Sequence, residues 1–329
     1  LPQLASEPTF IESPKHNTQE SILNNLQTYA STSQWFVKIM PELPEITVIA
    51  RQMNKETTGK HITDIEAKQP KNLNIPVPEF IKIAKGKTVK NVSSKGKWIF
   101  IKLDPTYYML INLGMNADLL YFTSNQKPPE KYQFKLTFTD KTGFTVQFQW
   151  FGYIHLVKEK DLSKHKLTAQ LGISPINKKF TLEHFKELLG SKKAGVKGFL
   201  LDQKNIAGIG NVYVQDILFE AKLHPNRKIS TLSEKEINDL YNAILDVVNR
   251  SIQLGGLAYE KDFYGQKGKF TINEFLVGYK TGKPCPTCNT PIEKIKTGST
   301  SSYICQKCQP LKQPLNTTKD MHQGCIKLH

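Results

Sequence analysis

Short apolar runs separated by turn signals fill the stretch from about residue 60 to residue 157. Runs of this length, rich in β-branched and aromatic residues, are typical of β-strands. A single helical pattern precedes them, with Ile46, Ile49 and Met53 spaced for one helix face and an end near Gly59. Strands are expected over 61–67, 88–92, 97–103, 108–113, 118–122, 133–139, 144–149 and 153–157. Many short strands with one flanking helix predict a β-sandwich or barrel.

The pattern becomes helical after Leu171. We expect helices over 182–189, 196–202, 212–221 and 234–254, followed by a small β-hairpin unit over 275–309. The chain is therefore expected to have an α+β fold with three domains, at 40–170, 171–272 and 273–310. The polar segments 1–39 and 311–329 carry little periodicity, apart from a short helical possibility at 21–29, and are expected to be disordered.

Charge adds information about the partner. The 329 residues carry a formal net charge of +16, and Lys and Arg are scattered from about residue 51 to 313. Basic folded surfaces suit a polyanion such as nucleic acid, although a general basic bias of the proteome would give the same total. No apolar run approaches the ~18 residues of a membrane span, and no secretory signal is evident. We expect a cytoplasmic, nucleoid-associated protein of bacterial type, without a membrane partner.

The cysteines indicate a metal site. Four of the five form two pairs, Cys285–Cys288 and Cys305–Cys308, separated by 16 residues. Two residues between thiolates allow each pair to turn back on one ion, and two such pairs complete a tetrahedral zinc shell. The alternative is two incidental cysteine pairs kept reduced by their compartment. Because four thiolates leave no open position for water, we expect one structural Zn²⁺ and catalysis elsewhere.

Four segments resemble the formamidopyrimidine-DNA glycosylase and endonuclease VIII family. They are the Met-Pro-Glu-Leu-Pro-Glu run at 40–45, Ser-Lys-Gly-Lys-Trp at 94–98, the glycine-rich stretch 205–213 with its continuation to 225, and the finger segment 277–309. They occur in the family's order and span about residues 40–310. The resemblance implies an N-terminal β-sandwich with a flanking helix, a helix–two-turn–helix domain and a β-hairpin zinc finger. The Leu-Pro form of the first segment favours the formamidopyrimidine branch.

The resemblance also implies the catalytic residues. Pro41 matches the family's N-terminal proline, whose secondary amine attacks the sugar C1′, displaces the damaged base and forms an iminium that permits strand cleavage. Glu42 matches the neighbouring acid/base, although an acidic residue at a helix start is also an ordinary cap. Lys97 matches a cation that holds a phosphate near the lesion. The implied activity is that of a bifunctional DNA glycosylase and abasic-site lyase, acting on oxidised or ring-opened bases by β/δ-elimination.

The DNA-binding residues follow from the same resemblance. Asn211 matches a phosphate-site residue, and the alternative is a plain helix N-cap. Lys197 matches a family lysine near the phosphate and base-binding region. Met115 and Phe151 match wedge residues that fill the gap left by an extruded base, with ordinary core packing as the alternative. Damaged double-stranded DNA is the expected partner of a monomer.

Two positions depart from the family pattern. Thr300 stands where the family's finger carries an arginine, and a hydroxyl supplies no bidentate, charge-assisted contact to a phosphate. Lys294 or Lys296 could partly replace that charge. Gln149 stands in place of the arginine that pairs with the orphaned base, and Trp150 follows it. Selection for cytosine opposite the lesion is therefore not implied, and Trp150 is a candidate to stack on a base.

A third departure concerns Pro41. While residues 1–39 remain attached, its nitrogen is a tertiary amide and cannot form an iminium. Translation is therefore expected to start at Met40, with exposure of Pro41 by processing as one alternative. Another alternative is a catalytically inactive damaged-DNA-binding protein of the same fold. A zinc-ribbon transcription factor would explain the finger and the charge, but not the segment 40–45.

Overall fold

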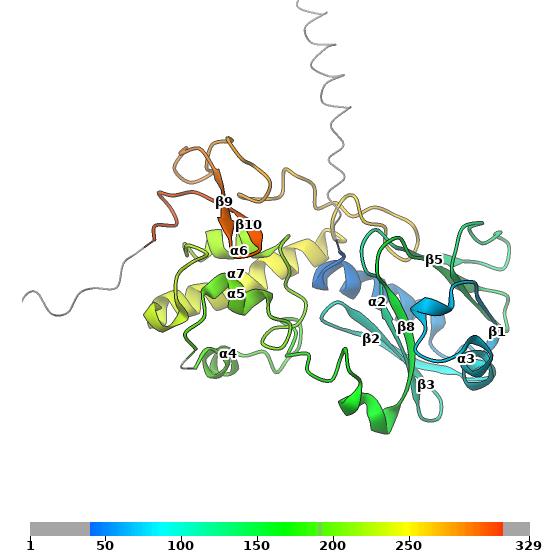
Figure 1. Cartoon of the computed structure of the whole chain (residues 1–329). Coiled ribbons are helices and arrows are strands. Elements are labelled where there is room, and N and C mark those ends of the chain that lie inside the picture. Colours follow the sequence, from blue (N-terminus) through cyan, green and yellow to red (C-terminus); the bar gives the residue numbers. More distant parts are fainter. Residues whose placement is uncertain (1–39, 191, 312–329) are drawn as a thin grey trace, which may run out of the picture. The chain divides into compact units, whose positions relative to one another are not determined.

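A computed structural model describes residues 40–190 and 192–311 of the chain (Figure 1). The disorder and the short helix expected within 1–39, and the disorder expected beyond Leu311, lie outside these residues. None of the helices formed by the described residues is long and apolar enough to cross a membrane.

Eight strands form two antiparallel sheets in the first half of the described chain. One sheet has the strand order β1-β6-β7-β5 and the other β2-β3-β4-β8. The strands are β1 (Ile62–Ala67), β2 (Val89–Lys95), β3 (Trp98–Leu103), β4 (Tyr107–Asn112), β5 (Asp118–Phe122), β6 (Phe134–Phe138), β7 (Gly143–Gln147) and β8 (Tyr153–Lys158). Each overlaps a run that the sequence predicts as a strand, so the expected β-sandwich is confirmed.

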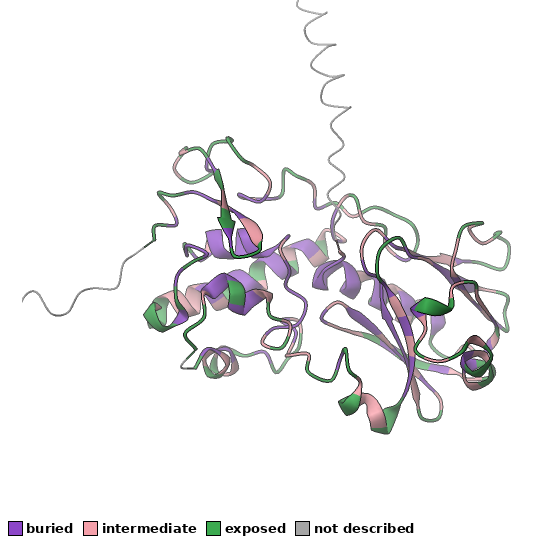
Figure 2. Ribbon diagram, in the orientation of Figure 1, coloured by how far each residue is buried: buried purple, intermediate pink, exposed green. Residues whose placement is uncertain are grey.

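The two sheets share one hydrophobic core. Ile99 and Met109 from one sheet and Phe134 and Phe144 from the other belong to the same buried cluster. Helix α2 (Leu43–Thr57) packs on β2 and contributes Ile46, Ile49 and Met53 to that cluster. Figure 2 shows that buried residues make up much of α2 and of these strands. Helix α2 is therefore anchored by its apolar face, which fixes the position of its N-terminus.

Helix α3 (Val77–Ala84) is not among the helices expected from the sequence. Its first turn contains Pro78 and is preceded by Pro76, and such a pair normally indicates a loop. Proline nevertheless fits the first turn of a helix, where the N–H group has no intrahelical partner. Burial of Phe80 and Ala84 then stabilises the helix. Short 3₁₀ turns at Pro70–Asn72, Glu159–Lys164 and Ile229–Thr231 were also not anticipated.

The second half of the described chain is helical. It contains α4 (Leu182–Leu189), α5 (Val196–Leu201), α6 (Val214–Glu220) and α7 (Glu234–Gln253) around a second hydrophobic core. Helix α7 begins with a capping box, in which Ser233 and Glu236 satisfy each other's backbone N–H groups. The glycine-rich turn 205–211 connects α5 to α6, and α6 starts at Val214, two residues later than expected. These helices confirm the α+β class of the fold. The domain limits at residues 170 and 272 remain a proposal.

The finger is a hairpin of β9 (Glu293–Thr297) and β10 (Thr300–Ile304), and β10 contacts α6. The segment before the hairpin is fixed by Asp216, a fully buried carboxylate on α6. Asp216 accepts hydrogen bonds from the N–H groups of Leu276, Val277 and Gly278 at 2.7, 3.0 and 3.0 Å. Three charge-assisted hydrogen bonds therefore connect the finger to the helical domain.

We predict that Asp216→Ala lowers the free energy of unfolding by about 3 kcal/mol, because three buried N–H groups lose their acceptor. Asp216→Asn retains an acceptor oxygen and should cost less. Urea denaturation measures both. Asp246→Ala, at an exposed position on α7, is the matched control and should change stability by less than about 0.5 kcal/mol. An Asp216→Ala variant as stable as the control would contradict the anchoring role.

Candidate active site

Pro41 and Glu42 lie at the start of α2, where the helical domain meets the sandwich. Both residues are buried, and Glu42 is 2% exposed. The carboxylate of Glu42 accepts hydrogen bonds from the N–H of Gly210 at 2.7 Å and from the N–H of Val212 at 3.1 Å. The neighbouring Leu43 N–H donates to the carbonyl of Gly208 at 3.1 Å. Hydrogen bonds to the glycine-rich turn 205–211 and to Val212 therefore hold the segment that carries Pro41 in place.

Lys97 lies on the turn between β2 and β3 and completes this cluster. Its Nζ is 3.7 Å from Glu42 Oε1, and its side chain is 17% exposed. The preceding Gly96 has φ +58°, and an added Cβ there would lie 2.9 Å from Cβ of Ala207. Glycine is therefore required on two counts, backbone conformation and close approach to the turn 205–211. Asn112 holds the Lys97 carbonyl through a 2.8 Å hydrogen bond. The structure thus brings the three predicted catalytic residues together.

The environment of Glu42 changes its acidity. Burial raises the pKa of Glu42 above its ordinary value, while Lys97 and the backbone N–H groups of Gly210, Val212 and Tyr213 partly oppose this rise. A carboxyl group with a raised pKa can exchange protons closer to neutral pH than an exposed glutamate. Glu42 is also the N-cap of α2, where it forms a capping box with Glu45, so the capping interpretation of this residue is confirmed as well.

A second buried carboxylate, Glu45, supports the first. Its Oε1 accepts hydrogen bonds from the hydroxyl of Tyr213 at 2.5 Å and from the N–H of Leu257 at 3.1 Å. Its Oε2 accepts from the N–H of Glu42 at 2.9 Å, and Ser251 contacts the Tyr213 hydroxyl at 2.6 Å. Burial raises the pKa of Glu45 to about 7. No role for these residues is predicted from the sequence, although a glutamate at the third helix position is a capping signal.

Asn211 follows the turn 205–211 but is not the N-cap of α6, whose N-cap is Tyr213. The N-cap interpretation was wrong because α6 starts later than its apolar pattern indicates. Gln215 holds Asn211 by donating to its carbonyl at 2.8 Å and to its side-chain oxygen at 3.1 Å. Val212 N–H is already used by Glu42. Gln215, 1% exposed, is a site residue that sequence reasoning missed.

The predicted wedge residues lie on two adjacent loops. Met115 and Trp150 are paired across these loops, with Met115 N–H donating to the Trp150 carbonyl at 2.9 Å. Phe151 is 67% exposed at φ +57°, and Gln149 is exposed beside it. A phenylalanine packed in the core would be buried, so core packing is excluded for Phe151. Met115 is only partly buried.

Lys197 lies on α5 and is 3% exposed. Its ammonium group points into the β9–β10 hairpin, where it donates a 2.9 Å hydrogen bond to the Thr300 hydroxyl. Burial lowers the pKa of Lys197 to about 8. Thr300 also donates to the carbonyl of Thr297 at 3.2 Å. The side chains of Lys197 and Thr300 therefore face each other within the protein.

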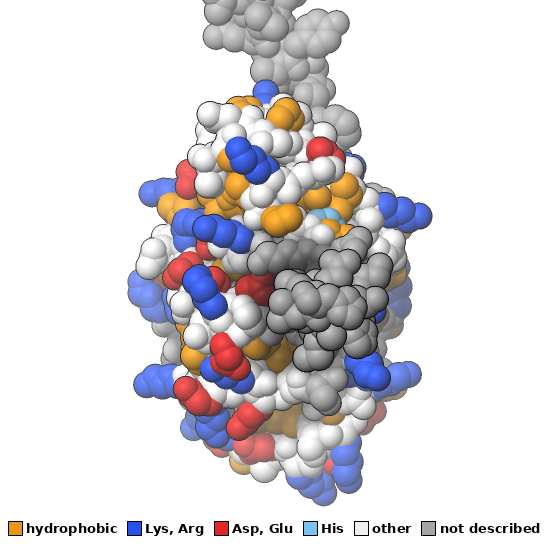
Figure 3. Space-filling view, turned by 90° about the vertical axis from the view of Figure 1, so that its left-hand side faces the viewer, with side chains coloured by type: hydrophobic (Ala, Val, Ile, Leu, Met, Phe, Trp, Pro, Cys, Tyr) orange, Lys and Arg blue, Asp and Glu red, His pale blue; other side chains and the backbone are white. Residues whose placement is uncertain are grey.

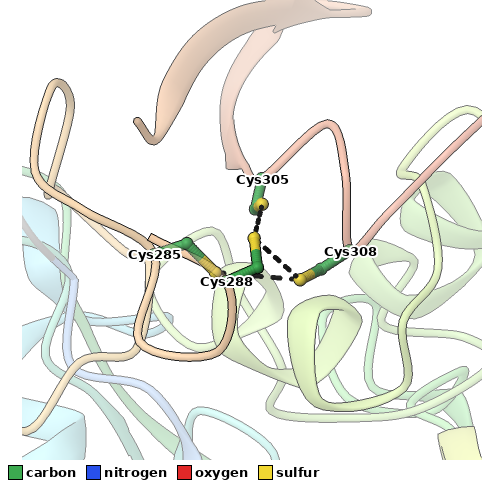
Figure 4. Close-up of side chains that lie close together, drawn as sticks. All are labelled: Cys285, Cys288, Cys305 and Cys308. Atoms are coloured by element: carbon green, nitrogen blue, oxygen red, sulfur yellow. Dashed lines mark hydrogen bonds between the residues drawn. The ribbon is translucent and has the colours of Figure 1, made fainter. Parts of the chain in front are cut away.

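The four cysteines of the two pairs converge at the base of the finger (Figure 4). Their sulfur atoms all lie within 4.8 Å of one another. Cys288 Sγ lies 3.4 Å from Cys305 Sγ and 3.5 Å from Cys308 Sγ, and Cys285 and Cys308 are 3.8 Å apart. Zn–S bonds of about 2.3 Å in a tetrahedron require sulfur separations of about 3.8 Å. The sulfur positions therefore fit a single zinc ion with four thiolate ligands.

Charged side chains are mixed on the surface. On the face seen in Figure 3, Lys and Arg are interspersed with Asp and Glu. Several lysines are paired, such as Lys102 with Glu159 at 2.8 Å and Lys235 with Asp239 at 2.6 Å. The net positive charge therefore does not by itself mark a binding surface on this face.

Comparison with protein families matches three consecutive parts of the chain. Residues 40–152 match the formamidopyrimidine-DNA glycosylase N-terminal domain, and residues 171–262 match the formamidopyrimidine-DNA glycosylase H2TH domain. Residues 282–311 match a zinc finger found in FPG and IleRS, and this range contains all four clustered cysteines. The chain therefore has one structural zinc site. These matches give no support to a zinc-ribbon transcription factor.

Whole-chain relatives agree with the domain matches. The formamidopyrimidine-DNA glycosylase of Pelotomaculum thermopropionicum is 36% identical over 281 residues, which cover 83% of this chain and 100% of the relative. That of Bacillus subtilis is 32% identical over 280 residues, with the same coverage of both chains. The solved structure of Lactococcus lactis Fpg in complex with DNA containing N7-benzyl-Fapy-dG has a TM-score of 0.74 and 28% identity, and covers 82% of this chain and 100% of the other.

A second Lactococcus lactis Fpg structure, in complex with DNA containing an abasic site, matches with the same TM-score and identity over 82% of this chain. The three family matches together include the sandwich, most of the helical part and the finger, and the residues clustered at the start of α2 lie within the first match. The chain belongs to the formamidopyrimidine-DNA glycosylase family, the DNA glycosylases of base-excision repair.

Proposed function

We propose that this protein is a bifunctional DNA glycosylase and abasic-site lyase that uses Pro41 as its nucleophile. The observation that carries the proposal is the buried Glu42 carboxylate beside Pro41, held by the N–H groups of Gly210 and Val212 and close to Lys97. A carboxylate, a cation and a proline next to one another supply an acid/base, a phosphate contact and a nucleophile. A purely structural N-terminus would not require this combination to be buried.

The chemistry assigns one role to each of these groups. The free secondary amine of Pro41 attacks C1′ of the damaged nucleotide, the glycosidic bond breaks, and the base departs with a proton. Glu42 transfers a proton to the sugar ring as it opens, which leaves an iminium between Pro41 and C1′. Glu42, ionised by this transfer, then removes a C2′ proton, which expels the 3′ phosphate by β-elimination, and δ-elimination releases the 5′ phosphate. Lys97 and Asn211 hold phosphates near the lesion.

The substrate is proposed to be double-stranded DNA containing an oxidised or ring-opened base. Two of the similar Lactococcus lactis Fpg structures contain Fapy-dG or abasic-site DNA, and a similar MutM structure contains carbocyclic 8-oxo-G DNA. The exposed Phe151, with Met115 beside it, is placed to fill the space left by an extruded base. Gln149 and Thr300 stand where the family pattern has arginine. The proposal therefore includes neither a preferred opposite base nor a preferred lesion. A monomer in the cytoplasm, associated with the nucleoid, is part of this proposal.

Borohydride trapping on a duplex with an abasic site tests the nucleophile. A protein that starts at Met40, from which the initiator methionine can be removed, should give a covalent adduct through Pro41. The full 329-residue chain should give none, because its Pro41 nitrogen is an amide. The match to the family's N-terminal domain begins at residue 40, which supports this design.

Tight binding of both proteins to the duplex without any adduct would remove the lyase assignment. The inactive damaged-DNA-binding alternative would then apply, although the relatives named formamidopyrimidine-DNA glycosylase give it no support at present.

The turn 205–211 provides a second test. Gly210→Ala would place a methyl group against the Glu42 carboxylate and the Lys97 ammonium. We expect the single-turnover cleavage rate to fall by ~100-fold, because a shift of about 1 Å in a catalytic group has effects of that size. Gly198→Ala on α5 is the matched control, since its added Cβ meets no heavy atom within 4 Å. Equal rates for the two variants, both folded by circular dichroism, would disconnect Glu42 from catalysis.

The pH dependence provides a third test. Lys97 lowers the pKa of Glu42 against the effect of burial, so Lys97→Met should raise that pKa further. If ionised Glu42 is the base in β-elimination, activity is gained as pH rises through its pKa. The acidic limb of the pH–rate profile should therefore move to higher pH, and the plateau should fall by ~100-fold. Lys95→Met, two residues away, should leave the limb in place; an unmoved limb in Lys97→Met would exclude Glu42 as that base.

A further inference from the structure

The ammonium group of Lys197 is enclosed by the tip of the β9–β10 hairpin. Its Nζ lies 2.9 Å from Thr297 Oγ1, 2.9 Å from Thr300 Oγ1, 2.8 Å from Ser302 Oγ and 2.7 Å from the carbonyl oxygen of Ser301. All four oxygens are neutral and come from the segment 297–302. With a side chain that is almost completely buried, Lys197 can reach no phosphate in this conformation.

The Lys197 ammonium group holds the polar groups of the hairpin in fixed positions. An ammonium group has three N–H donors, so four oxygens within hydrogen-bond distance saturate it. Hydrogen bonds to a charged group are stronger than those between neutral groups. The three hydroxyls are consequently turned inward, toward α5. Thr300, which departs from the family's arginine, is one of these inward-facing residues.

The strand register shows what the opposite face of the hairpin carries. Thr297 pairs with Thr300, whereas Lys296 pairs with Ser301 and Lys294 with Tyr303. Side chains alternate between the two faces of a strand, so Lys294 and Lys296 project from the face opposite to the Lys197 contacts. Both lysines are exposed. Fixing the inner face therefore also fixes the direction of these two cations.

The outer face is continuous with the surroundings of Glu42. Lys294 Nζ lies 6.0 Å from the ring centroid of Tyr303, and the Tyr303 ring lies 5.1 Å from that of Tyr279. Burial is the main cause that raises the pKa of Tyr279, and the charge of Glu42 adds to it. Gln215 adds a further connection, since it accepts from Tyr303 N–H at 3.1 Å and donates to Asn211 Oδ1 at 3.1 Å. The hairpin is thus tied to the phosphate-site residue as well.

We propose that Lys197 is a positioning residue, which fixes the hairpin so that Lys294 and Lys296, on the face opposite to Thr300, bind DNA phosphates. This proposal rests on the DNA-binding part of the proposed function. It assigns the finger's phosphate contacts to two residues on β9, and it makes Lys197 act on DNA only through the hairpin.

Salt dependence separates a positioning lysine from a phosphate-binding one. A lysine that contacts a phosphate contributes about one unit to the slope of log Kd against log salt, whereas a positioning residue contributes none. The probe is a duplex with a tetrahydrofuran abasic analogue. Its Kd is measured from about 50 to about 200 mM salt, because the affinity of proteins for DNA changes strongly over this range. Lys294→Met and Lys296→Met should each lower the slope by about one.

For Lys197→Met we expect a ~10-fold weaker Kd and an unchanged slope, because the hairpin is displaced without losing a phosphate contact. Thr300→Val, which removes one acceptor, should weaken binding less, and the double variant should bind no worse than Lys197→Met alone. Lys193→Met, at an exposed position near the start of α5, is the control and should match wild type within about twofold.

A slope reduced by about one in Lys197→Met would overturn the proposal, as would additive effects of Lys197→Met and Thr300→Val. Slopes unchanged in both Lys294→Met and Lys296→Met would overturn it too. Zinc content and thermal melting of each variant identify any loss of folding, and Thr300→Val then carries the test. Single-turnover cleavage at saturating protein should be equal in the control Lys193→Met and wild type. If neither cleaves, the lyase proposal fails while the binding measurements still decide the role of Lys197.

Discussion

The buried carboxylate of Glu42 is the constraint on which the site depends. A carboxylate removed from water needs hydrogen-bond donors, and the described structure supplies them from the backbone of Gly210 and Val212, about 170 residues later in the chain. Glu45 imposes the same requirement one turn further on, and it is met by Tyr213 and by Leu257 N–H. The start of α2 and the turn 205–211 each depend on the other for hydrogen-bond partners: Gly210 N–H donates to Glu42, and Leu43 N–H donates to the carbonyl of Gly208. The meeting of the two domains is therefore specified by electrostatics as much as by apolar packing.

Close approach of backbones follows from this arrangement. The N–H of Gly210 can reach Glu42 only because no side chain intervenes, and a Cβ at Gly208 would lie 2.6 Å from Cβ of Leu43. A Cβ at Gly96 would likewise lie 2.9 Å from Cβ of Ala207, and this close approach positions the following Lys97. The glycines around the site thus have a geometric role, which is to let three backbone segments come into contact. They also explain how a proline, a carboxylate and a lysine from distant parts of the chain come to lie together.

The sequence predicts the elements well, because each has a local cause. The eight strands and the helices α2 and α4–α7 follow from apolar periodicity and turn residues, and the zinc site follows from cysteine spacing. Helix α3 was missed because Pro76 and Pro78 obscure its start. The residues of the site were predicted from the family resemblance, but their tertiary contacts were not. Nothing near Lys197 in the sequence indicates that its hydrogen-bond partners lie about 100 residues away. Gln215 was missed for the same reason.

The residues around the start of α2 and the zinc finger have different roles. The groups suited to chemistry lie where α2, the turn before β3 and the turn 205–211 converge, and the buried environment there tunes acidity. The finger contributes no reactive group, because its four thiolates fill a zinc shell and its inward hydroxyls surround Lys197. What the finger offers DNA is geometry and charge, and both depend on its attachment through Asp216, Gln215 and Lys197. Loss of an arginine at position 300 is therefore compatible with a functional finger, provided that the attached hairpin presents other cations in a fixed direction.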